Sequence, residues 1–171
     1  MHMSAKKVLV TYATRYGTTG EIAEEIGAVL TGAGLDTDII PVMEVAGIDA
    51  YDAVVIGSPL YMGKILVEAR EFCEQYKPYL EGKWIAVFVN GISLCSQGTD
   101  TEPPMLAAID AMAPYVSIAE KAIFGGRLSM KGLSEADMQL ATIAGAREGD
   151  YLNMDDLRAW AKGIVQTVTD L

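Results

Sequence analysis

The strongest constraint on this chain is a regular alternation of short apolar segments with longer amphipathic ones. The short segments are rich in β-branched residues, and we expect strands at residues 7–12, 38–42, 53–56, 84–89 and 116–124. Between them, apolar residues recur at helical spacing. This alternation predicts an α/β fold, a doubly wound five-stranded parallel sheet with helices on both faces.

The amphipathic segments also give the extent of the domain. We expect a helix at residues 101–113 and a last helix with one apolar seam, formed by Leu157, Trp160, Ala161, Ile164, Val165 and Val168. The chain has 171 residues and shows no linker, internal repeat or low-complexity segment. A single domain over residues 1–171 is therefore expected.

Composition excludes several classes of partner. Thirteen Lys and Arg residues stand against 23 Asp and Glu residues, which gives a net charge of −10. Such a chain is a poor ligand for nucleic-acid phosphates and for anionic membranes. No apolar run approaches the ~18 residues of a spanning helix, and no export signal is visible at the N-terminus. We expect a cytoplasmic protein without stable membrane insertion.

Cysteine and histidine are too few for two common kinds of site. The chain has Cys73, Cys95 and His2, with no CxxC pair. A cysteine/histidine zinc site and a histidine-based catalytic triad are excluded. Cys73 lies on a helical apolar stripe and is expected in the core. No metal ligand and no catalytic residue is predicted.

A long excursion, residues 127–150, interrupts the alternation before the last helix. Ser134 and Asp137 have capping-box spacing, and Leu133 with Met138 has the spacing of a hydrophobic staple. A short helix is expected at about residues 135–144. A connection of this length is often functional. Its apolar residues are candidates for a docking lip; the alternative is a helix packed onto the sheet edge.

The polar loop after the first strand has the chemistry of a phosphate site. In the strand order 2-1-3-4-5, ligands bind at the carboxyl ends of strands one and three. The loop offers hydroxyl groups, one positive charge and the N–H groups of the following helix. Its candidate residues are Thr14, Arg15, Tyr16, Gly17, Thr18 and Thr19. The alternative is a polar turn with ordinary helix capping.

Other phosphate-binding motifs are missing after the first strand. Neither GxGxxG nor GxxxxGK[ST] is present there, which argues against dinucleotides and nucleoside triphosphates. A phospho-acceptor receiver domain needs an aspartate at the end of the third strand, where this chain has Gly57-Ser58-Pro59. That class is also excluded.

The first loop and its helix resemble the signature of the flavodoxin family. The matching positions are Val10, Tyr12, Thr14, Gly17, Thr19, Ala23 and Ile26. The resemblance implies a flavodoxin-like sheet and FMN as the cofactor, with its phosphate on the first loop. Tyr16 stands where the family commonly has a small hydroxyl residue, and Arg15 is the candidate substitute for that contact.

The same resemblance implies two loops at the flavin ring. A flat ring needs an apolar or aromatic face to stack on, and the implied wall is Pro59, Leu60, Tyr61, Met62 and Gly63. Local packing is the alternative for this loop. After the fourth strand, the implied contacts to the pyrimidine edge, mainly through the backbone, are Asn90, Gly91, Ile92, Ser93 and Cys95.

The flavodoxin resemblance implies an electron carrier. No general base or nucleophile is predicted beside the ring, so the chemistry belongs to the cofactor. Carboxylates around a reduced, anionic flavin raise the energy of the last electron added. We therefore expect electron transfer at low potential to redox proteins with basic docking surfaces. The alternative for the negative charge is solubility alone.

A narrower resemblance leaves an enzyme open. Residues 14–19, 122–128 and 148–151, with Trp160, resemble menaquinone-dependent protoporphyrinogen dehydrogenases and their flavodoxin-domain relatives. This implies an FMN-dependent dehydrogenase or quinone reductase, with quinone or porphyrinogen contact at residues 127–150. The acidic composition argues against a membrane-docking enzyme. A flavin-free flavodoxin-fold interaction module is the third alternative.

Overall fold

The central sheet has the predicted topology. A computed structural model describes residues 5–91, 102–143, 145 and 148–171. Its strands follow the order β2-β1-β3-β5-β6, and all neighbours in this order are parallel. Their bounds are β1 Lys7–Tyr12, β2 Asp36–Pro41, β3 Ala53–Tyr61, β5 Trp84–Gly91 and β6 Glu120–Gly125. The doubly wound five-stranded sheet of order 2-1-3-4-5 is confirmed.

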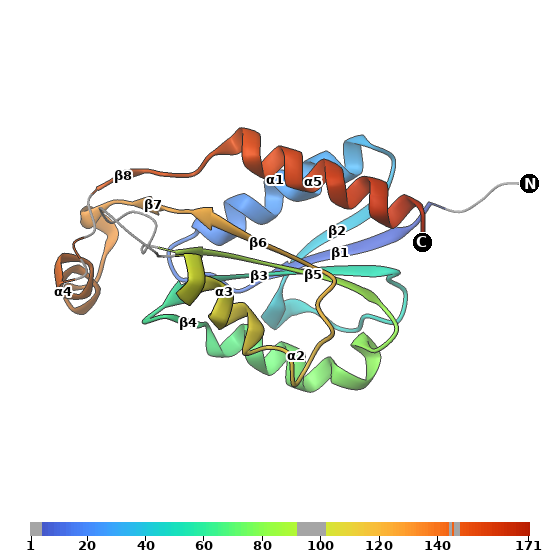
Figure 1. Cartoon of the computed structure of the whole chain (residues 1–171), viewed down its shortest axis with the longest axis horizontal. Coiled ribbons are helices and arrows are strands. Elements are labelled where there is room, and N and C mark those ends of the chain that lie inside the picture. The colour runs from blue at the N-terminus through green and yellow to red at the C-terminus, as the bar shows by residue number, and fades with distance from the viewer. Residues whose placement is uncertain (1–4, 92–101, 144, 146–147) are drawn as a thin grey trace, which may run out of the picture.

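Helices cover both faces of this sheet (Figure 1). On one face lie α1 (Thr18–Gly32) and α5 (Met154–Thr169), on the other α2 (Val67–Leu80) and α3 (Glu102–Asp110). Side chains alternate along a strand, so Val8 packs in the cluster with α1 and α5, and Leu9 in the cluster with α2 and α3. Burial on both faces explains why the strands are apolar throughout.

The third strand is longer than predicted. We expected it to end at Ile56, but β3 continues to Tyr61 and then turns back into β4 (Lys64–Ile65). The parallel register with β5 continues to the pair Leu60 and Gly91. The register with β1 ends at Gly57, so Pro59, which cannot donate a ladder hydrogen bond, lies where one edge of the strand is no longer covered by β1.

Smaller differences concern the ends of other elements. The second strand begins at Asp36 rather than residue 38, and Val42 already belongs to the turn η1 (Val42–Glu44). The last sheet strand begins at Glu120 rather than residue 116. The helix expected over 101–113 ends at Asp110, and residue 101 lies outside the described part of the chain.

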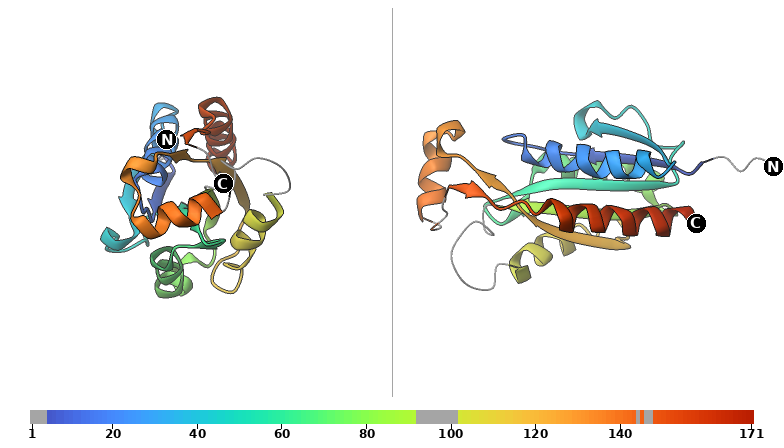
Figure 2. Two further views of the ribbon diagram at one scale, coloured as in Figure 1. Left: turned by 90° about the vertical axis from the view of Figure 1, so that its left-hand side faces the viewer. Right: turned by 90° about the horizontal axis from the view of Figure 1, so that it is seen from above.

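The excursion before α5 forms a separate layer beyond the sheet (Figure 2). It contains β7 (Arg127–Leu128), η3 (Met130–Gly132), α4 (Glu135–Ile143) and β8 (Gly149–Asp150), and β7 pairs with β8 in an antiparallel ribbon. The helix predicted at about 135–144 is confirmed to residue 143. The ribbon and β4 were not predicted.

One expectation for the excursion is wrong. Helix α4 does not pack on the sheet edge, because it lies past the ends of the strands (Figures 1 and 2). Leu133 packs against the small cluster of Leu128 and Ala141, and Met138 is exposed; the staple between Leu133 and Met138 stays a prediction. The excursion therefore adds a wall at one end of the molecule.

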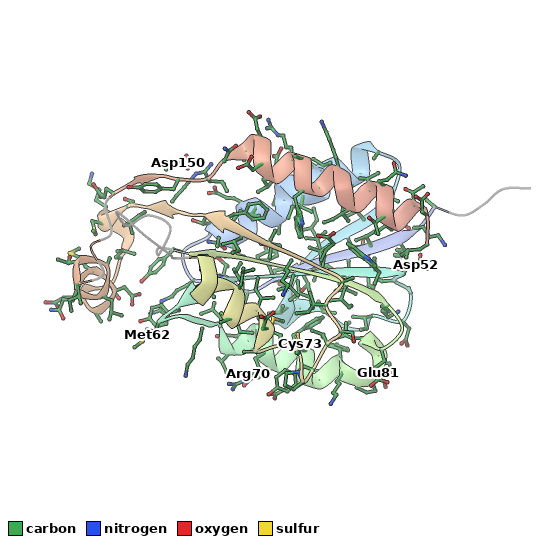
Figure 3. All side chains as sticks on the ribbon, viewed as in Figure 1. Asp52, Met62, Arg70, Cys73, Glu81 and Asp150 are labelled. Atoms are coloured by element: carbon green, nitrogen blue, oxygen red, sulfur yellow. The ribbon has the colours of Figure 1, made fainter. Side chains whose placement is uncertain are left out.

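The two ends of the sheet differ in what surrounds them. Figure 3 shows Met62 and Asp150 at the end where α4 lies, and Asp52 at the opposite end. Since Met62 follows β3 directly, the end with α4 holds the carboxyl ends of the parallel strands. None of the described helices has the length and apolar character that crossing a membrane requires.

Candidate functional site

A cavity of about 810 Å³ opens at the carboxyl ends of β1, β3 and β5. This volume lies in the usual range for small-molecule sites, roughly 300–1,000 Å³. One side of the cavity is lined by residues that follow β1 and by the ends of β3 and β5; the other side is lined by residues 126–143 of the excursion. Its position is the one that the topology of a doubly wound sheet predicts.

The loop after β1 presents free backbone donors to this cavity. Gly17 is the N-cap of α1, with φ +93°, and its N–H donates to Thr14 Oγ1 at 2.9 Å. This conformation favours glycine because a Cβ would be strained there. The N–H groups of Thr18, Thr19 and Gly20 lie in the first helical turn, where the helix has no acceptor for them. They form a site for an anion, favoured by the helix dipole.

The three threonines of this loop have different roles. Thr14 Oγ1 accepts from Gly17, so its hydroxyl hydrogen is not used in that bond. Thr18 lines the cavity, and no hydrogen bond within the described part of the chain engages its hydroxyl. Thr19 is buried and donates to Asn90 Oδ1 at 2.7 Å. Thr14 and Thr18 can donate to an anion, whereas the hydroxyl hydrogen of Thr19 joins α1 to β5.

The predicted ring wall is a hairpin rather than an open loop. Tyr61 pairs with Lys64, and the two residues between them, Met62 and Gly63, have φ +53° and +76°. Two positive φ values in a two-residue turn are typical of type I′ hairpins. Leu60 is buried and Tyr61 half-buried, while Met62 is 73% exposed. The hairpin holds the Tyr61 ring against the cavity.

The predicted pyrimidine-edge loop is described only at its start. Asn90 and Gly91, the last residues of β5, line the cavity, and the Asn90 side chain is buried. Ile92, Ser93 and Cys95 lie outside the described residues. Cys73 is buried in the core as expected, and burial raises the pKa of its thiol to about 12.

A carboxylate that the sequence did not single out as a site residue connects the two walls of the cavity. Asp137 of α4 is 3% exposed, and its Oδ2 accepts from the Tyr16 hydroxyl and from Arg15 Nε at 3.0 Å. Its Oδ1 accepts from the Tyr61 hydroxyl at 2.5 Å. The Arg15 guanidinium also lies 4.2 Å from the centre of the Tyr61 ring. We call these four residues the Asp137 cluster.

The hydrogen bonds of the cluster decide its protonation states. Burial raises the pKa of the Asp137 carboxyl, but the bonds from Tyr16, Tyr61, Arg15 and Ser134 outweigh burial and hold this pKa at about 2. The bond to Asp137 raises the pKa of the Tyr61 phenol and of the Arg15 guanidinium. Near neutral pH Asp137 is therefore an ionised carboxylate, Arg15 a charged guanidinium and Tyr61 a neutral phenol.

A second ion pair joins the excursion to α1. Arg127 pairs with Glu21 in the first turn of α1 and, through Nε, with Asp150 of β8 at 3.0 Å. Hydrogen bonds from the Leu152 N–H and from Arg127 lower the pKa of the Asp150 carboxyl. Among the described residues that line the cavity, the charged ones are Arg15, Glu21, Arg127 and Asp137, so positive and negative charges balance in this part of the lining. The expected surplus of carboxylates around the ring is not found in the described lining.

The excursion also contributes an apolar part of the lining. This part, which we call the apolar wall, is formed by Leu128, Leu133, Leu140, Ala141 and Ile143, beside the polar lining residues Arg127, Ser129 and Asp137. The apolar residues predicted for the docking lip are Leu128, Met130, Leu133, Met138, Leu140 and Ile143. All of them except Met130 and Met138 line the cavity. In the structure they face the cavity from the side opposite the loop after β1.

Most of the predicted site residues meet at this cavity. Those that line it are Thr14, Arg15, Tyr16, Thr18, Thr19, Pro59, Leu60, Tyr61, Met62, Gly63, Asn90 and Gly91. Gly17 shapes the loop without lining the cavity. Asp137 was not predicted as a site residue, although its spacing from Ser134 indicated a helix start: the Asp137 N–H donates to Ser134 Oγ at 3.2 Å.

Comparison with known proteins gives one consistent result. The family model described as Flavodoxin domain matches residues 9–150. "Probable flavodoxin 1" of Bacillus subtilis (strain 168) is 25% identical over 161 residues, which cover 88% of this chain and 97% of the relative.

Solved structures show the same fold. A flavodoxin from Streptococcus pneumonia TIGR4 superposes with a TM-score of 0.63 at 18% identity, covering 94% of this chain and 99% of its own. A flavoprotein in complex with FMN from Lactobacillus acidophilus NCFM superposes with a TM-score of 0.53 at 16% identity, covering 70% of this chain and 93% of its own.

Proposed function

Because the chain belongs to the flavodoxin domain family, we propose that its cavity binds FMN and that the loaded protein carries electrons between protein partners. Flavodoxins bind FMN, and the flavoprotein from Lactobacillus acidophilus was solved with it. The observation that carries the proposal is the set of free donors at the N-terminus of α1, which lies where a doubly wound sheet binds its ligand.

The residues of the cavity fit the parts of FMN. A phosphate monoester needs several donors, and the loop after β1 offers the hydroxyls of Thr14 and Thr18 with the first N–H groups of α1. A flat ring needs an apolar or aromatic wall, which Leu60 and Tyr61 supply. We assign Asn90 and Gly91, which end β5 and line the cavity, to the pyrimidine edge. Ile92, Ser93 and Cys95 stay predictions.

The protein's part in such a reaction is to bind and shield. Bound FMN supplies the electron transfer. The loop after β1 fixes the phosphate end, and the bond from Thr19 to Asn90 holds that loop against β5. From the excursion, the buried side chain of Leu128 and the half-buried Leu133 give this side of the cavity an apolar lining.

The net negative charge of the molecule favours electron transfer at low potential, but it acts on the flavin only from a distance. The net charge of −10 opposes the addition of electrons. The charges of the described cavity lining are balanced, however, and exposed charges more than about 8–10 Å away are largely screened at physiological salt. We propose basic docking surfaces on the redox partners because the whole molecule, rather than the cavity, is acidic.

A second candidate is a flavin-dependent oxidoreductase with its own small substrate. The observation that favours it is the apolar wall formed by Leu128, Leu133, Leu140 and Ile143, which leaves room for an apolar molecule beside the ring. A quinone or a porphyrinogen has this character. Turnover of one of them by the FMN-loaded protein, faster than transfer to protein acceptors, would favour this second candidate.

The proposal is tested by comparing FMN with riboflavin, which lacks the phosphate. Thr18→Val removes one hydroxyl and keeps the shape of the side chain. Hydrogen bonds to charged groups contribute about 1.5–3 kcal/mol, so we expect FMN to bind about tenfold or more weaker to the variant, with riboflavin unchanged. Fluorescence titration of both flavins measures this.

Thr167→Val is the matched control. Thr167 is an exposed helical threonine of α5 whose hydroxyl donates to Gly163 O at 3.1 Å, far from the cavity. This variant should bind both flavins like the wild type. Equal losses of FMN and riboflavin in Thr18→Val would show that the loop does not hold the phosphate. If the wild-type protein binds neither flavin, the flavin-free interaction module is the alternative that remains.

A further inference from the structure

Helix α4 has little apolar packing of its own. Its buried residues are Asp137 and Ala141, and Ala141 belongs to a small cluster with Leu128 that is separate from the two main cores. Ile143 at the end of the helix is 83% exposed. Apolar burial stabilises in proportion to the area removed from water. The contact between Ala141 and Leu128 therefore contributes little free energy to holding the helix at the cavity.

The polar contacts of α4 to the rest of the molecule centre on Asp137. Burying an ionised carboxylate is costly unless it is paired and hydrogen-bonded. Both oxygens of Asp137 have such partners: Oδ2 binds the Tyr16 hydroxyl and two nitrogens of Arg15, Nε at 3.0 Å and Nη2 at 2.9 Å. Oδ1 binds the Tyr61 hydroxyl. Charge-assisted bonds of this kind are stronger than neutral ones.

The partners of Asp137 come from two separate loops. Arg15 and Tyr16 belong to the loop after β1, whereas Tyr61 belongs to the β3–β4 hairpin. Arg15 lies between these loops, with its guanidinium carbon 4.2 Å from the Tyr61 ring centre and 5.7 Å from that of Tyr16. Asp137 thus fixes the phosphate side, the ring side and the excursion relative to one another.

We propose that Asp137 is a positioning residue of the FMN cavity, which holds Arg15, Tyr16 and Tyr61 in place and thereby keeps α4 closed against the cavity. Toward FMN this inference rests on the proposed function. Arg15 neutralises Asp137 rather than the phosphate, which is bound by neutral donors. Loss of the carboxylate opens the excursion side and lets either flavin leave faster.

The first test needs no flavin. Hydrogen exchange is measured in the full chain for Asp137→Asn and for Glu135→Gln, an exposed acidic residue of the same helix. We expect the amides of residues 135–143 to exchange about tenfold faster or more in Asp137→Asn, with α5 unchanged. Glu135→Gln should match the wild type. Unchanged exchange in α4 of Asp137→Asn would overturn the inference.

The second test measures release of bound flavin. We expect the dissociation rates of FMN and of riboflavin to be higher in Asp137→Asn than in Glu135→Gln, by similar factors for the two flavins. We also expect the visible circular dichroism of the bound flavin to change in Asp137→Asn, because Tyr61 is no longer fixed. If Asp137 only stabilised the fold, the dichroism of the bound flavin would not change. An unchanged dichroism would therefore overturn the inference. Tighter FMN with unchanged riboflavin would also overturn it, because Arg15 would then be released to the phosphate.

Tyr61→Phe provides a second variant that keeps the aromatic ring. It removes one donor to Asp137 and should speed α4 exchange and flavin release in the same direction, by a smaller factor. If the wild type binds no flavin, the proposed function fails, and the exchange experiment alone then decides whether Asp137 positions α4. The two failures are therefore distinguishable.

Discussion

Helices α5 and α4 follow one another closely in the chain but are held in opposite ways. Helix α5 buries Leu157, Ala161, Ile164 and Val168 in the core with β1, β3 and α1. Helix α4 buries one carboxylate and one alanine, and contacts the sheet end through the Asp137 cluster. An apolar seam therefore holds α5 in the core, whereas the Asp137 cluster joins α4 to the loops at the cavity.

The largest expected effect separates the two helices directly. Leu157→Ala should lower the free energy of unfolding by about 2–5 kcal/mol, because it leaves a cavity in a fully buried seam. Ile143→Ala, in exposed α4, should stay within about 0.5 kcal/mol of the wild type. Urea unfolding measures both. Similar losses in the two variants would break the comparison.

The second prediction concerns pH. The pKa of Asp137 in the folded protein is lowered to about 2 from 3.8, so its contribution to stability is complete above about pH 5 and is lost as the pH falls toward 2. Asp137→Asn should cost about 1–3 kcal/mol at neutral pH, since Arg15 can turn to solvent. Urea unfolding from pH 7 to 3 measures the difference in free energy of unfolding between the wild type and Asp137→Asn. This difference should be constant above pH 5 and should become smaller below pH 4. A difference already lost at pH 5 would contradict the ionised cluster.

A third change tests the loop that faces α4 across the cavity. Gly17→Ala forces an alanine to φ +93°, although its Cβ would meet no atom within 4 Å. We expect a loss of about 1–2 kcal/mol from backbone strain alone. Gly32→Ala, in the last turn of α1 where φ is not positive, is the control and should not destabilise. Thermal unfolding that finds the two variants equal would show that the conformation of Gly17 is not constrained.

The smallest effect sharpens the role of the hairpin. Met62 is exposed at φ +53°, a conformation that asparagine tolerates better in type I′ turns. Met62→Asn should therefore stabilise the protein by about 0.5–1 kcal/mol, without changing hydrogen exchange in α4. Thermal unfolding checks the first part. Faster exchange in α4 would mean that the Met62 side chain, and not only Tyr61, holds the excursion.

Features that depend on the residues of one segment alone could be predicted from the sequence. The seam of α5 is periodic, and the helix at 135 carries its own cap through Ser134, so both could be located in advance. The length of β3 could not, because Gly57-Ser58-Pro59 is typical of a turn until its pairing with β5 is known. The role of Asp137 could not either, since its partners Arg15 and Tyr61 lie 122 and 76 residues away.

The central claim is that FMN binds at the strand ends, between the loop after β1 and the excursion. Hydrogen exchange of the full chain with and without FMN tests this most directly. We predict slower exchange at residues 14–20, 59–65 and 135–143 when FMN is added, with the amides of α5 unchanged. Unchanged exchange in these three segments, or protection elsewhere in the chain, would contradict the claim.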